Sequence, residues 1–127
     1  MDSATRPARI LIAEDEEPVR EFVERALRHA GYEVDSVKDG MDALAVLVKS
    51  RYDLLVTDIV MPGMDGIALA LKVAKDYPDM RIMMMTGYAA EQHRAHNLDA
   101  LIHKVVSKPF SLAELCSSVA QVLDKDE

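Results

Sequence analysis

A short apolar run at residues 54–56 places the strongest constraint on the fold of this chain. The run is too short for a stable helix, and it is apolar enough for a strand that is buried on both faces. Asp58 follows almost directly, and a proline and two glycines then break the chain. Asp58 is therefore predicted to end an inner strand, at the edge where open α/β sheets hold their ligands. Taken alone, such an aspartate is more often a turn residue than a reactive group.

Segments with strand character and segments with helix character alternate five times along the chain. The predicted strands cover residues 9–13, 33–37, 54–56, 81–86 and 101–106, and the predicted helices begin near Glu17, Gly40, Gly66, Ala89 and Ser111. This alternation with short connections is typical of a parallel sheet that is covered by helices on both faces. The fold class predicted from the pattern is therefore α/β.

Length and charge limit the kinds of protein that this chain can be. The 127 residues correspond to one domain, predicted at 9–124 between a flexible N-terminal tail at 1–8 and a C-terminal tail at 125–127. The net charge of −7 argues against nucleic acid or an anionic membrane as the main partner. Cys116 is the only cysteine, which excludes an intrachain disulfide. We expect a cytoplasmic protein, since no apolar stretch is long enough to span a bilayer.

Five polar residues follow four of the predicted strands, and they are Glu14, Asp15, Asp58, Thr86 and Lys108. Because the carboxyl ends of parallel strands share one edge of a sheet, we expect these side chains to converge there. Three carboxylates at one place need a cation, and oxygen-only ligands suit Mg²⁺. The lysine and the threonine hydroxyl add groups that suit a transferring phosphoryl group. With Asp58 as the nucleophile, the product would be an aspartyl phosphate.

Four short motifs together resemble the response-regulator receiver domain of two-component signalling. They are Glu14-Asp15, the segment DIVMPGMDG at 58–66, Thr86-Gly87, and Ser107-Lys108-Pro109-Phe110. The resemblance covers about residues 10–123. It implies a flavodoxin-like (βα)5 three-layer sandwich with a parallel sheet in the order 2-1-3-4-5.

The resemblance also implies a role for each site residue. Asp58 matches the phosphoacceptor, and Thr86 and Lys108 match the groups that contact the phosphoryl oxygens. The metal ligands implied for Mg²⁺ are Asp15, Asp58 and the backbone carbonyl of Val60, with Glu14 acting mostly through water.

Two further features follow from the same resemblance. The Lys108-Pro109 peptide bond is expected to be cis. Val105 stands where many receivers carry a tyrosine or phenylalanine that reports phosphorylation, so Tyr88 is the candidate to replace that aromatic switch.

The resemblance implies a binding module that catalyses only its own phosphorylation and dephosphorylation. Its phosphoryl donor would be a histidine kinase or histidine phosphotransfer protein, and phosphorylation would switch a protein-binding surface. Residues 85–89 and 107–110 are similar to stand-alone CpdR-type receivers, which implies the ClpXP protease as a downstream partner. The alternative is a flavin- or nucleotide-binding protein of flavodoxin-like fold. That function needs a loop rich in glycine, serine or threonine after the first strand, where this chain has four acidic residues.

Overall fold

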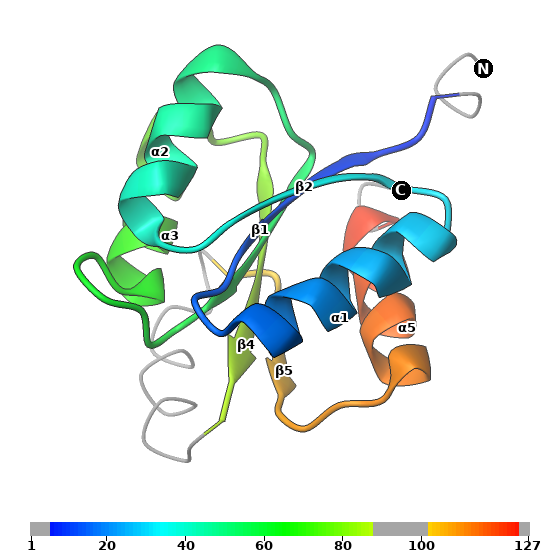
Figure 1. The fold of residues 1–127 in the computed structure, drawn as a ribbon. Helices are drawn as coiled ribbons and strands as arrows, with labels where there is room; N and C mark the ends of the chain where they lie inside the picture. The colour runs from blue at the N-terminus through cyan, green and yellow to red at the C-terminus, as the bar shows by residue number, and fades with distance from the viewer. Residues whose placement is uncertain (1–5, 88–101, 125–127) are drawn as a thin grey trace.

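The computed structural model describes residues 6–87 and 102–124 (Figure 1). The elements in this part of the chain are β1 (Arg9–Ala13), α1 (Glu17–His29), β2 (Glu33–Val37), α2 (Gly40–Lys49), β3 (Leu54–Asp58), α3 (Gly66–Asp76), β4 (Arg81–Thr86), β5 (Lys104–Ser107) and α5 (Leu112–Leu123). All four strand pairs are parallel, and the strand order is β2-β1-β3-β4-β5. The predicted fold class and strand order are confirmed.

The sheet lies between two helical layers, with α1 and α5 on one face and α2 and α3 on the other (Figure 1). Each strand contributes side chains to the core on both faces of the sheet, because successive side chains of a strand point to opposite faces. Leu11 and Leu55 pack with α2 and α3, whereas Ile10 and Leu54 pack with α1 and α5. The apolar runs of the inner strands are therefore explained by burial on both faces.

Three consecutive methionines in β4 follow the same rule. Met84 packs against the α2 and α3 side, and Met83 and Met85 pack against the α1 and α5 side. All three side chains are fully buried. The run is therefore core packing on a strand that helices cover on both faces.

Local sequence sets several of the helix ends. Ser111 and Glu114 form a capping box at the start of α5: the Ser111 hydroxyl accepts the Glu114 N–H at 3.0 Å, and the Glu114 carboxylate accepts the Ser111 N–H at 2.8 Å. The Asp39 and Asp65 side chains cap α2 and α3. Each accepts a hydrogen bond from the backbone N–H of the third residue of its helix. Gly31, which follows the C-cap residue Ala30 of α1, has φ of 105°, a conformation that glycine adopts without strain.

The predicted start of the fifth strand was wrong. The strand begins at Lys104, because the residue before it bonds to β4 through its side chain. The imidazole Nδ1 of His103 accepts the Ile82 N–H at 3.0 Å, while the His103 N–H donates to the Ile82 carbonyl at 2.8 Å. The imidazole therefore takes the place of a backbone carbonyl, and regular pairing starts one residue later.

Some predictions fall on residues that the structure does not describe. The predicted helix at 89–97, Tyr88, and most of the two predicted tails lie outside the described residues. Among the helices at 6–87 and 102–124, none combines the length and the apolar character that a membrane span requires.

Candidate functional site

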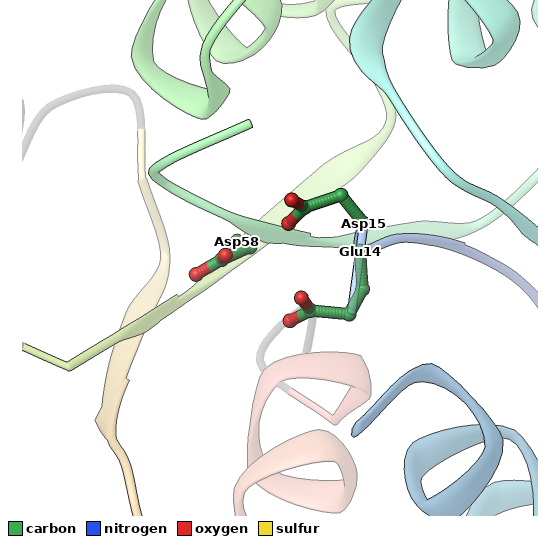
Figure 2. A group of neighbouring side chains, drawn as sticks. All are labelled: Glu14, Asp15 and Asp58. Atoms are coloured by element: carbon green, nitrogen blue, oxygen red, sulfur yellow. The ribbon is translucent and has the colours of Figure 1, made fainter. Parts of the chain in front are cut away.

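The carboxyl ends of β1 and β3 bring the predicted acidic residues together. These strands are neighbours, with Ala13 opposite Thr57 in the register, so the residues that follow Ala13 lie beside Asp58. Asp58 and Glu14 are buried, whereas Asp15 is exposed. Figure 2 shows the three carboxylates directed into the same space. One oxygen of each lies within 4.8 Å of the others, which is close enough for a shared cation.

Lys108 joins this cluster from the loop that follows β5. Its Nζ lies 3.0 Å from Glu14 Oε1 and 3.1 Å from Asp58 Oδ1, so one ammonium bridges two buried carboxylates. The Lys108 backbone N–H donates to the Thr86 carbonyl at 2.7 Å, which ties the loop to the end of β4. The Lys108-Pro109 peptide bond is cis, as expected.

Burial dominates the electrostatics of the cluster. Desolvation raises the pKa of Asp58 above its usual value, even though the charge and hydrogen bond of Lys108 act in the opposite direction. Desolvation also raises the pKa of Glu14, against hydrogen bonds from the Glu16 backbone and Lys108. For Lys108 burial lowers the pKa, but the hydrogen bond to Glu14 and the charge of Asp58 outweigh it and raise the pKa overall. With three carboxylates and one ammonium, the cluster carries more negative charge than Lys108 neutralises.

Both carboxylate oxygens of Glu14 accept hydrogen bonds from the protein, which holds the side chain in place. Oε1 pairs with Lys108, and Oε2 accepts the Glu16 backbone N–H at 3.0 Å. Arg20, on α1, donates from Nη1 to the Glu14 backbone carbonyl at 3.0 Å. Sequence analysis missed Arg20, because nothing in the α1 pattern distinguishes this arginine from others on the same helix.

The cluster opens into a cavity of about 650 Å³. Its lining includes the charged residues Asp15, Glu16, Asp58 and Lys108, together with Val60 and Gly87. The remaining wall is largely apolar and consists of Pro18, Val19, Phe22, Pro109 and Phe110, with the two phenylalanine rings 6.2 Å apart. Asp58 therefore lines an open cavity whose wall has both charged and apolar residues.

Thr86 lies at the end of β4, where it is fully buried and stands opposite Ser107 of β5. The structure therefore gathers the ends of β1, β3, β4 and β5 at one edge, as predicted for these site residues. Val60 is about half exposed in the loop directly after β3.

Close backbone packing fixes the chain on both sides of Asp58. The buried Thr57 hydroxyl donates to the Asp58 carbonyl at 2.9 Å. The Gly66 N–H donates to the Ile59 carbonyl at 2.7 Å, and a β-carbon on Gly66 would overlap the Asp58 carbonyl oxygen. Sequence analysis treated Gly66 as a chain break at the start of a helix. The glycine is also needed because α3 begins in contact with the backbone of Asp58.

The sequence profile of the response regulator receiver domain matches residues 10–120, which is most of the chain. The chain therefore belongs to the response regulator receiver domain family, a class of signalling modules.

Two curated relatives and one solved structure show the range of proteins that are similar to this chain. The response regulator receiver protein CpdR of Brucella abortus is 42% identical over 91% of this chain and 96% of its own length. The sensor kinase CckA of the same organism is 37% identical over 94% of this chain but only 13% of its own length. The response regulator TrrA of Thermotoga maritima, solved in complex with Mg²⁺-BeF, is 32% identical with a TM-score of 0.82, covering 91% of this chain and 98% of that one.

Proposed function

We propose that this chain accepts a phosphoryl group on Asp58, with Mg²⁺, and thereby switches a protein-binding surface. The observation that carries the proposal is the position of the Asp58 carboxylate, 3.1 Å from Lys108, in the wall of an open cavity and beside two further carboxylates. A nucleophile, a fixed positive charge and a set of metal-ligating oxygens are the groups that phosphoryl transfer requires.

The donor set fits Mg²⁺. Three carboxylates gather within 4.8 Å with one ammonium among them, so the cluster retains an excess of negative charge for a divalent cation. Asp15, Asp58 and the Val60 carbonyl would be the direct ligands. Both oxygens of Glu14 already accept hydrogen bonds from the protein, which suits a role through water. Bound Mg²⁺ would neutralise charge that develops on the phosphoryl oxygens.

The donor would be the phosphohistidine of a histidine kinase or histidine phosphotransfer protein. An Asp58 oxygen forms a bond to phosphorus while the phosphorus–nitrogen bond breaks, and the electron pair of that bond returns to the imidazole, which takes up a proton. Lys108 would then pair with a phosphoryl oxygen in place of the Asp58 oxygen that it contacts now. The Thr86 hydroxyl would donate a hydrogen bond to another phosphoryl oxygen.

Incubation with acetyl phosphate and Mg²⁺ tests this chemistry. We expect intact-protein mass spectrometry to show one added phosphoryl group, which is labile to base and absent when EDTA replaces Mg²⁺. Asp58→Asn should remove the adduct, and Asp79→Asn, at an exposed loop position, should retain it. An adduct that survives in the Asp58 variant would refute the assignment of the nucleophile.

The ClpXP protease is the downstream partner that we propose, on the basis of the similarity to CpdR-type receivers. Purified ClpXP should bind the immobilised protein differently when beryllofluoride and Mg²⁺ occupy the site at Asp58. Equal binding in both states, or none in either, would remove this partner without affecting the phosphoacceptor assignment.

The flavin or nucleotide alternative has less support. The segment after β1 carries the buried Glu14 and the exposed acidic residues Asp15, Glu16 and Glu17, which repel a phosphate that lacks a bridging cation. An absorption spectrum of the purified protein that shows bound flavin would favour that alternative.

A further inference from the structure

The first residue of α2 lies against the loop that follows β3. A β-carbon on Gly40 would lie 2.9 Å from the Met64 carbonyl oxygen and 3.1 Å from the Met64 β-carbon. The first of these separations is shorter than carbon–oxygen packing allows. Gly40 does not have the positive φ that itself favours glycine. The reason for glycine here is therefore the close approach to Met64.

Met64 has little freedom to move away from such a contact. Its side chain is half-buried and packs against the core between the sheet and α2 and α3. The next residue, Asp65, caps α3 by accepting the Ala68 N–H at 2.9 Å. Gly66 then bonds to Ile59 and touches the Asp58 carbonyl. The segment 60–65 is thus a short bridge, anchored beside Asp58 at both ends and supported by Gly40 near its C-terminal end.

We propose that Gly40 is a positioning residue for the site at Asp58. Its missing side chain lets α2 support the loop at Met64, and that loop carries Val60, which lines the cavity and whose carbonyl is a proposed Mg²⁺ ligand. This inference rests on the proposed function. It adds a residue from another helix, outside the acidic cluster, whose contact sets the position of the loop.

Gly40→Ala tests the inference because two accounts of Gly40 predict different results. Helix propensity alone predicts no harm from alanine, whereas the contact with Met64 predicts a displaced loop. In an ordinary helix start, alanine is the better helix former and should leave stability unchanged or higher. If the contact with Met64 positions the loop, the new β-carbon must displace the Met64 carbonyl and, with it, the Val60 carbonyl.

We expect Gly40→Ala to weaken Mg²⁺ binding, measured by calorimetry, and to slow phosphorylation by acetyl phosphate. A displacement of a few tenths of an ångström should reduce each by roughly threefold to tenfold, since misplacement by about 1 Å can cost about a hundredfold. Two control variants should retain the Mg²⁺ affinity of the original chain. Met41→Ala alters the next, exposed position of α2, and Val119→Ala weakens the core on the opposite face of the sheet.

The double variant Gly40→Ala/Met64→Gly separates positioning from general damage. Glycine at 64 removes the side-chain atoms that the new β-carbon meets at 3.1 and 3.2 Å, although the carbonyl contact remains. Alanine at 40 should therefore weaken Mg²⁺ binding less in the Met64→Gly background than in the original chain. If Gly40→Ala alone does not fold, the double variant should still bind Mg²⁺ more weakly than Met64→Gly alone, because the carbonyl contact remains.

Two results would overturn the inference: a folded Gly40→Ala variant with unchanged Mg²⁺ affinity and phosphorylation rate, or, where that variant does not fold, equal Mg²⁺ affinity of Met64→Gly and the double variant. Failure of the proposed function has a different result, because the unaltered chain would then acquire no phosphoryl group, while Mg²⁺ affinity would still report on Gly40.

Discussion

Replacing Asp58 by asparagine is expected to stabilise the metal-free protein at neutral pH. The Asp58 carboxylate is buried and faces Glu14 and Asp15 within 4.8 Å, and the Lys108 ammonium at 3.1 Å opposes their repulsion. Asparagine keeps the size of the side chain and an oxygen that accepts from Lys108, but it removes the negative charge.

Coulomb energies give the size of the effect. At an effective dielectric constant of about 20, each repulsion at that separation amounts to about 3.5 kcal/mol, and the attraction to Lys108 to about 5 kcal/mol. The excess repulsion is about 1–2 kcal/mol. Solvent screening of the exposed Asp15 reduces this repulsion. Desolvation of the buried Asp58 carboxylate adds to the cost of its charge. We therefore expect the asparagine variant to gain about 1–2 kcal/mol, or roughly 4–7 °C in Tm for a chain of this length.

Urea unfolding followed by circular dichroism, with EDTA and then with Mg²⁺, measures this difference. The raised pKa of Asp58 determines how the stability difference between the two proteins depends on pH. A carboxyl group whose pKa is higher in the folded state destabilises the fold when it is ionised, so the advantage of asparagine should be full at neutral pH. The advantage should decline on acidification through the folded pKa towards the usual value, and Mg²⁺ should also reduce it. A variant that is less stable than the original chain in EDTA at neutral pH would refute this account of the site.

Three other substitutions have expected outcomes, each measured by urea unfolding. Lys108→Met should destabilise the metal-free fold by roughly 2–3 kcal/mol, because two buried carboxylates lose their counter-charge, and acidification should restore part of that loss; a neutral effect would contradict the bridging role. Gly66→Ala should reduce stability by about 3 kcal/mol or more, because a β-carbon meets the backbone of Asp58, whereas Gly87→Ala, where a β-carbon has open space, is the matched control. Ser111→Ala should lose about 1 kcal/mol with the capping box, and a loss confined to Glu114→Ala would contradict the reciprocal cap.

Features that depend on neighbouring residues were predictable from the sequence. The bounds of β1, β2 and β4 agree with the predicted ranges, since short apolar or alternating runs between turn residues specify strands locally. The capping box at Ser111 is likewise a local pattern. The start of β5 was not predictable, because it depends on a hydrogen bond from Ile82 to the His103 side chain, twenty-one residues apart in sequence.

The sequence by itself determined which polar residues reach the carboxyl edge of the sheet, because polar residues that follow parallel strands must share that edge. Only the tertiary structure decided how they pair. Lys108 bridges Glu14, ninety-four residues away, and Asp58, and Arg20 holds the Glu14 carbonyl from α1. The close approaches at Gly40 and Gly66 likewise arise where separate helices meet the loop after β3. Periodicity reports which face of an element is buried, whereas contacts such as these depend on how the elements pack against one another.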